Sequence, residues 1–214
     1  MRIVITGASR GIGQELSQRY QAQGHEVIGT SRSGENGLVA LDVTDPDALL
    51  TLKKTIGDAP IELLICNAGI YPDKYETMPD GYPAQMWQEG WATNVTGVFL
   101  TVQALLPNIQ EARGKIAIIS SQMASHTRAP GGSYIYRASK AAVLNLGRNL
   151  ATDLSRDGIS VGIYHPGWVQ TDMGGDNAEI DVGTSVSGLM DRFTDLSLSN
   201  TGCFEAWDGK AMPY

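Results

Sequence analysis

Tyr136 and Lys140 stand four residues apart in a segment, Ser133 to Ser155, that is predicted to form a long helix. This spacing puts both side chains on one helix face with their tips close together. A free tyrosine titrates near pH ~10, but a neighbouring ammonium stabilises the phenolate and lowers the tyrosine pKa. The pair therefore predicts a proton donor beside a cation. Taken alone, the same spacing also fits a surface tyrosine and a solvated lysine.

A glycine-rich turn near the start of the chain offers backbone amides to an anion. Gly7, Gly11 and Gly13 follow the predicted strand Arg2 to Thr6 and precede the predicted helix Gln14 to Gln23. Glycines at such a turn let amides at a helix N-terminus approach a pyrophosphate. The spacing G-x-x-x-G-x-G departs from the G-x-G-x-x-G fingerprint, so an ordinary structural turn is the alternative. The position directly after the first strand favours a dinucleotide site.

The end of the second predicted strand, His25 to Thr30, carries an arginine where NAD-binding folds place an acid. Ser31 and Arg32 follow that strand, and no Asp or Glu is available there for the ribose 2′-hydroxyl. Arg32, together with Arg10 in the glycine turn, could hold a 2′-phosphate through bidentate, charge-assisted hydrogen bonds. We therefore predict NADP(H) as the cofactor. NAD(H) is the alternative if both arginines are solvated surface residues.

Strand-like and helix-like segments alternate along the chain. Continuous apolar runs such as Ile61 to Cys66 are typical of parallel strands covered on both faces. The other predicted strands are Leu38 to Leu41, Lys115 to Ser120 and Ile159 to Tyr164, and the other predicted helices are Asp45 to Ile56 and Ala84 to Gln110. We predict an α/β fold, a single Rossmann-type domain over residues 1–214 with a doubly wound parallel sheet of about seven strands flanked by helices. Residues 174–184 are predicted to form a short substrate loop, with a lid as one role open to it.

The composition excludes several classes of protein. A formal net charge of −7 argues against wide contact with nucleic acid or anionic membrane, because both need a basic face. Cys66 and Cys203 are the only cysteines, and no Cys/His cluster has metal-ligand spacing, so neither a disulfide scaffold nor a metal site is expected. The first predicted strand follows Met1 so closely that no secretory signal is expected, and no apolar run approaches the ~20 residues of a membrane span. With two cysteines expected as reduced thiols, we predict a cytoplasmic protein.

Six motifs occur in a fixed order between residue 3 and about residue 173. They are Thr6 to Gly13, Asn67 to Gly69, Asn94, Ser120-Ser121, Tyr136 with Lys140, and Pro166-Gly167 with Thr171. Together they resemble the short-chain dehydrogenase/reductase family. The segments around Tyr136 and Pro166, with the tail Trp207 to Lys210, are similar to the compact C-factor-like and sniffer-type carbonyl reductases within it.

The resemblance implies catalytic roles for four residues. Tyr136 is the general acid that protonates a carbonyl oxygen, or the base in the reverse direction, and Lys140 also holds the nicotinamide ribose hydroxyls. Ser121, in preference to Ser120, orients the substrate oxygen. Fifteen positions separate Ser121 from Tyr136, which predicts an expanded loop and leaves that register open. Asn94 holds a water in a proton relay, the alternative being a polar residue that merely distorts its helix.

The resemblance also implies the residues that contact the cofactor. They are Gly7, Ser9, Arg10, Gly11, Ile12, Gly13, Arg32, Asp42, Val43, Asn67, Ala68, Gly69, Tyr136, Lys140, Pro166, Gly167, Val169 and Thr171. Two of them have structural alternatives: Asp42 fits a helix-capping turn equally well, and Asn67 more plausibly braces the backbone than touches a ligand.

The function expected from this resemblance is hydride transfer between NADP(H) and a small-molecule carbonyl or alcohol. The alternative is a dinucleotide-binding sensor or signalling protein whose output is partner binding, which loss of Tyr136 or Lys140 would have favoured. The family resemblance also suggests a homodimer or homotetramer.

Overall fold

The computed structural model describes residues 1–214 and contains one seven-stranded sheet in which every neighbouring pair is parallel. The strand order is β3-β2-β1-β4-β5-β6-β7. The strands are β1 (Arg2–Ile5), β2 (Glu26–Ser31), β3 (Val39–Ala40), β4 (Leu63–Cys66), β5 (Lys115–Ile119), β6 (Ser160–His165) and β7 (Phe204–Ala206). The strand order reverses direction between β1 and β4, which is where doubly wound sheets bind ligands. The predicted fold class is confirmed.

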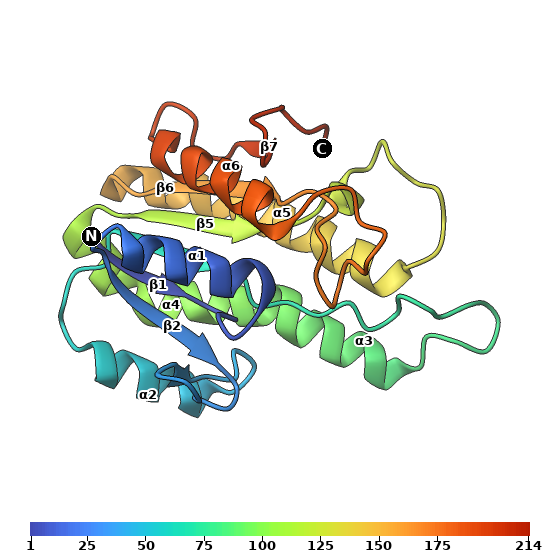
Figure 1. Ribbon diagram of the computed structural model, residues 1–214, viewed down its shortest axis with the longest axis horizontal. Coiled ribbons are helices and arrows are strands. Elements are labelled where there is room, and N and C mark those ends of the chain that lie inside the picture. The colour runs from blue at the N-terminus through green and yellow to red at the C-terminus, as the bar shows by residue number, and fades with distance from the viewer.

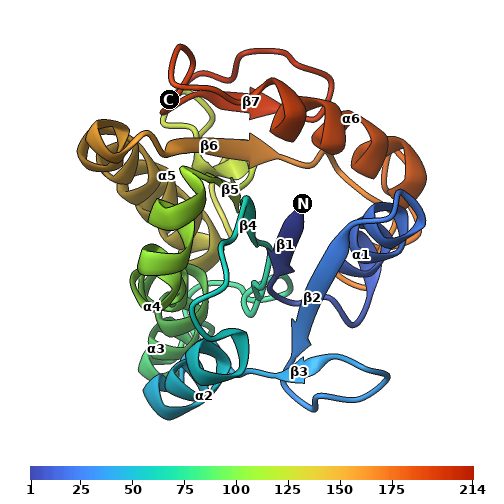
Figure 2. The same cartoon turned by 90° about the vertical axis from the view of Figure 1, so that its left-hand side faces the viewer.

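Helices cover both faces of this sheet (Figure 2). The helices are α1 (Gly11–Ala22), α2 (Pro46–Ile56), α3 (Ala84–Trp91), α4 (Gly97–Ala112), α5 (Tyr134–Leu154) and α6 (Val182–Asp195). Helices α1 and α6 lie side by side on one face, and α2, α4 and α5 lie on the other. None of these helices is both long and apolar enough to cross a membrane.

The core divides into two layers, one on each face of the sheet. Because side chains alternate along a strand, Val4 packs in one layer and its neighbours Ile3 and Ile5 in the other. All four residues of β4 are buried, as expected for a central parallel strand. The apolar runs predicted from the sequence are thus explained by burial on both faces.

The structure corrects three predicted boundaries. The helix predicted from Ala84 to Gln110 is interrupted by a π-helical turn over Ala92–Thr96. The predicted loop over residues 174–184 ends three residues early, because the Asp181 carboxylate accepts a hydrogen bond from Thr184 N at 2.8 Å and caps α6. The third strand shrinks to Val39–Ala40.

The segments that follow β4, β5 and β6 extend beyond the same edge of the sheet, at the right of Figure 1, next to α3 and the start of α5. Because the carboxyl ends of parallel strands meet at this edge, residues far apart in sequence converge here. The candidate site is built from these segments and from the glycine turn after β1.

Candidate active site

The N-terminus of α1 presents unpaired amides. Its N-cap, Arg10, has extended backbone and makes no side-chain cap, and the first helical bond runs from Gln14 N to Arg10 O at 3.3 Å. The amides of Gly11, Ile12 and Gly13 therefore have no carbonyl partner, and all three residues line a cleft. Such amides, with the positive end of the helix dipole, suit a pyrophosphate.

The glycines of this turn are required by close backbone approach. A Cβ on Gly13 would lie 2.2 Å from Gly7 O and 2.6 Å from Asn67 Nδ2. Asn67 Nδ2 donates to Thr6 O at 3.0 Å and to Gly7 O at 2.9 Å. Asn67 thus braces the glycine turn, the role that we favoured for it.

Gly13→Ala is expected to abolish tight dinucleotide binding, because the added methyl would displace both Gly7 and Asn67. Calorimetric titration with NADPH would measure the loss. Gly183→Ala is the matched control, since the added Cβ would meet only the tip of Arg19 and the Asp181 carboxylate, at 3.0 and 3.1 Å. Unchanged affinity in a folded Gly13→Ala protein would contradict the assignment of this turn.

The cleft has a volume of about 900 Å³, within the range of cofactor sites. The predicted residues that line it are Gly7, Ser9, Arg10, Gly11, Ile12, Gly13, Arg32, Asp42, Val43, Asn67, Ala68, Gly69, Tyr136, Lys140, Pro166 and Thr171. Of the predicted site residues, Ser121, Asn94, Gly167 and Val169 do not line it. Val169 is buried and bridges to Ile180, and a Cβ on Gly167 would lie 2.5 Å from Ile180 Cδ1, so both support the cleft wall from behind.

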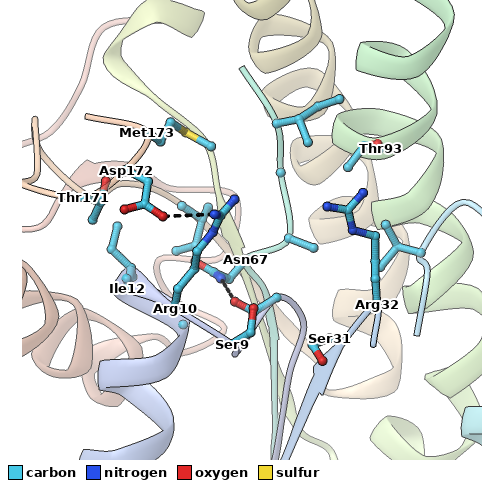
Figure 3. Close-up of a pocket in the computed structure, with 18 of the residues that line it drawn as sticks. Ser9, Arg10, Ile12, Ser31, Arg32, Asn67, Thr93, Thr171, Asp172 and Met173 are labelled. Atoms are coloured by element: carbon cyan, nitrogen blue, oxygen red, sulfur yellow. Dashed lines mark hydrogen bonds and ion pairs between the residues drawn. The ribbon is translucent and has the colours of Figure 1, made fainter. Parts of the chain in front are cut away.

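The two predicted phosphate-binding arginines have different surroundings (Figure 3). Arg10 Nη1 pairs with Asp172 Oδ2 at 2.9 Å, and both side chains are exposed. Arg32 lies apart from this pair, next to Ser31 at the end of β2, and forms no ion pair. The guanidinium that is free to bind a 2′-phosphate is therefore that of Arg32.

Asp42 takes part in a turn as well as lining the cleft. Its Oδ1 accepts from Thr44 N at 2.9 Å and from Thr44 Oγ1 at 2.7 Å. These bonds, and to a smaller extent the charge of Arg32, hold the pKa of Asp42 below its usual value, while burial opposes them. The cap of α2 is a different residue, Asp45.

Tyr136 and Lys140 are both buried on α5 at the cleft wall. Lys140 Nζ lies 5.6 Å from the Tyr136 ring centroid and donates to Ile119 O at 2.9 Å. Burial lowers the pKa of Lys140 to about 8. Burial also raises the pKa of Tyr136, opposed by a hydrogen bond with Ser121. We predicted a lowered tyrosine pKa; its direction is the opposite, because desolvation of the phenolate dominates.

The structure places Ser121 near Tyr136, whereas Ser120, and not Ser121, is among the residues that line the cleft. The Ser121 hydroxyl lies near Tyr136, where it opposes the rise in the tyrosine pKa, and it accepts a hydrogen bond from Met123 N at 3.1 Å at the start of a short helical turn. Ser120 Oγ donates to Lys140 O at 3.1 Å and so ties α5 to the end of β5. The extra residues before Tyr136 form an irregular loop from Ser125 to Ser133. The added length therefore lies after Ser121 and does not change its position at the end of β5.

Asn94 lies in the π-helical turn and clamps a neighbouring segment. Its Oδ1 accepts from Ile70 N, and its Nδ2 donates to Ile70 O and to Ser139 Oγ, each at 2.9 Å. Both amide hydrogens are used in these bonds. A Cβ on Gly69 would lie 3.3 Å from Asn94 Oδ1 and 3.5 Å from Lys140 Nζ, so the two side chains converge on one backbone position. Because Asn94 lies inside the π-helical turn, the alternative role, a polar residue in a distorted helix, also agrees with the structure.

Residues 1–180 match the family model described as short chain dehydrogenase. The chain belongs to the short-chain dehydrogenase family. Among curated relatives, the 3-oxoacyl-(acyl-carrier-protein) reductase FabG of Escherichia coli strain K12 is 33% identical over 187 residues, 79% of this chain and 74% of the relative. The C-signal protein of Myxococcus xanthus is 34% identical over 157 residues, 72% of this chain and 93% of the relative.

Solved structures of carbonyl reductases match over the full length of this chain. An NADPH-bound carbonyl reductase from chicken fatty liver has a TM-score of 0.90 and 29% identity, covering 100% of this chain and 98% of that one. The carbonyl reductase Sniffer of D. melanogaster has a TM-score of 0.92 and 27% identity, covering 100% and 99%. The predicted family resemblance, including its sniffer-type subgroup, is confirmed.

Several residues at this short-chain dehydrogenase site escaped the sequence analysis. The cleft is also lined by Thr44, Ile70, Thr93, Asp172 and Val182. Asp172 directly follows Thr171 of the Pro-Gly motif, so its position could have drawn attention to it. Thr93 precedes the Asn94 motif, but nothing in its type or spacing distinguishes it from other helical threonines.

Proposed function

We propose that this short-chain dehydrogenase transfers hydride between NADP(H) and a carbonyl or alcohol, using Tyr136, Lys140, Ser121 and Asn94. The observation that carries the proposal is the position of the Tyr136–Lys140 pair, at the wall of a cleft that also holds the unpaired amides of α1. Relatives support it: FabG is named a reductase, and the chicken carbonyl reductase is bound to NADPH.

The residues of the site fit a bound NADP(H), and each of the four proposed catalytic residues has a separate role in the reaction. The bound nicotinamide supplies the hydride. Tyr136 donates its proton to the carbonyl oxygen, and Ser121 hydrogen-bonds to the same oxygen and stabilises the charge that develops there. Lys140 holds the ribose hydroxyls, and a water held at Asn94 returns a proton toward Lys140.

Reduction of a panel of aldehydes, ketones and quinones, followed by loss of NADPH absorbance, tests the proposal. We expect turnover with at least one of these classes. A folded protein that binds NADPH and reduces none of them would overturn it in favour of the dinucleotide-binding sensor.

Arg32→Ala is expected to weaken NADPH binding roughly 10- to 100-fold and to leave NADH binding unchanged, because a charged hydrogen bond contributes ~1.5–3 kcal/mol. The ratio of kcat/KM for the two cofactors measures the effect. Arg10→Ala is the control: Arg10 already pairs with Asp172, so its loss is expected to change that ratio little. Unchanged NADPH preference in Arg32→Ala would remove Arg32 from the site.

Assembly and location are further proposals. We expect a homodimer or homotetramer, to be measured by light scattering of the purified protein. The cytoplasmic location remains a prediction, which the two free cysteines, Cys66 and Cys203, suit. No group of His, Cys, Asp and Glu side chains in the structure could hold a metal ion.

A further inference from the structure

A fully buried carboxylate lies at the start of the helix that carries Tyr136 and Lys140. Asp73 is 0% exposed. Its Oδ2 accepts from Ile135 N at 2.7 Å, and its Oδ1 accepts from Tyr136 N at 3.1 Å. The local N-cap of α5, Ser133, has a left-handed backbone with φ of 49° and makes no side-chain cap. The cap of this helix therefore comes from a residue more than sixty positions earlier in the chain.

The same segment also holds the side chain of Tyr136. The ring of Tyr71 stacks on the ring of Tyr136, with centroids 4.1 Å apart and planes 18° apart. The Tyr71 hydroxyl is hydrogen-bonded to Ser133 Oγ. Asn94 in turn holds Ile70 by its N–H and its C=O. Residues 70–73 thus fix Tyr136 at its backbone amide and at its ring.

Capping a helix with a buried carboxylate carries a large cost in desolvation free energy. An ion without water loses much of its solvation, and only strong hydrogen bonds or a partner of opposite charge offset that cost. Asp73 forms no salt bridge, so its compensation comes from the two amides and from the positive end of the α5 dipole. Asp73 is fully buried and does not line the cleft, so its carboxylate has no direct access to a ligand bound there.

We infer that Asp73 is a positioning residue that sets the place of the Tyr136 hydroxyl beside Ser121 and Lys140. The inference rests on the proposed function of Tyr136. A carboxylate that binds two successive amides fixes both the start and the rotation of α5, and a small rotation there moves the tyrosine hydroxyl at the far end of its side chain. Displacement of a reacting group by ~1 Å can cost about 10²-fold in rate.

The test compares Asp73→Asn and Asp73→Ala with the wild type by two readouts. The first is the NMR signal of tyrosine labelled at Cζ, with Tyr136 assigned from Tyr136→Phe and the buried Tyr164 as internal reference. The second is kcat on the carbonyl compound found in the panel, with the NADPH Kd. We expect the Tyr136 signal to move while the Tyr164 signal stays. We expect kcat to fall roughly 10- to 100-fold in Asp73→Ala and less in Asp73→Asn, which keeps one acceptor oxygen.

Asp45→Ala provides the matched control, because Asp45 caps α2 through a bond from Asp47 N at 2.9 Å and is not part of the cleft. It is expected to lower thermal stability but not kcat. If a folded Asp73 variant keeps both the wild-type Tyr136 signal and the wild-type kcat, the positioning role is overturned. If the wild type reduces nothing, the proposed function fails, whereas the NMR comparison still decides whether Asp73 sets the surroundings of Tyr136. Asp73→Asn has nearly the same shape and serves if the alanine variant does not fold.

Discussion

Tyr136→Phe is expected to lower kcat by roughly 10²-fold or more, the scale of general acid catalysis, and to leave the Kd for NADPH nearly unchanged. The variant keeps the ring that stacks on Tyr71 and loses only the hydroxyl. Because the hydroxyl acts on the substrate oxygen, the loss should appear in kcat and not in cofactor affinity. Steady-state kinetics and NADPH titration of the same preparation measure both quantities.

Tyr134→Phe is the matched control for this variant. Tyr134 lies two residues earlier on α5, its side chain is exposed, and its ring packs edge-on against Tyr82. The position four residues after it is Ala138, so it has no lysine partner. We expect wild-type kcat in Tyr134→Phe. Full activity in Tyr136→Phe would refute the proposed acid.

Lys140→Met is expected to abolish most activity and to change how stability depends on pH. In the proposed mechanism the ammonium holds the cofactor ribose and lies next to Tyr136, so we expect a loss in kcat/KM of roughly 10²-fold or more. The stability effect follows from burial, which lowers the pKa of Lys140 from 10.5 to about 8. Burial of the ammonium therefore destabilises the folded state, but only at pH values at which the lysine is charged.

The sign of the pH dependence is set by the two pKa values. Below pH 8 the lysine is protonated in both states, and the full cost of burial is present. Between the folded pKa of about 8 and the unfolded value of 10.5, the folded state binds fewer protons, so stability rises with pH, by on the order of 3 kcal/mol over the whole interval. Lys140→Met is expected to lack this rise.

Urea unfolding at several pH values between neutrality and pH ~10 measures the free energy of unfolding of both proteins. Other groups contribute in the same range, notably Cys66, whose thiol has a pKa of 9.0 in the unfolded chain and of about 12 when buried. These groups are common to both proteins, so the difference between the two curves isolates Lys140. Parallel curves would mean that the lysine is solvated or paired in the native protein.

The sequence predicts the strands and the Tyr136–Lys140 pair because both are local patterns. An apolar run such as that of β4 is recognisable without its partners, and a spacing of four residues on a helix brings two side chains together whatever surrounds them. The glycine turn is predictable for the same reason. It lies at a fixed place after the first strand, and its glycines permit close backbone approach.

What could not be predicted depends on contacts between distant segments. The direction of the Tyr136 pKa shift depends on how deeply this residue is buried on α5, which no local sequence pattern indicates. The pairing of Arg10 with Asp172 joins residues 162 positions apart, and the cap from Asp73 joins residues more than sixty apart. Helix α6 is a different case. Its buried Val186, Leu189 and Phe193 follow helical spacing, but the glycine-rich loop before it obscured the start of the pattern.

The π-helical turn limits how the chain can change its length. An α-helix turns about 100° per residue, so the extra residue in the 92–96 turn sets the rotation of α3 relative to α4. Deleting one residue there would swing Trp87 and Trp91 to another side of the molecule and pull Asn94 away from Ile70. The irregular loop over residues 125–133 has no such constraint. Insertions and deletions among homologous chains should therefore accumulate in that loop and be rare in the turn.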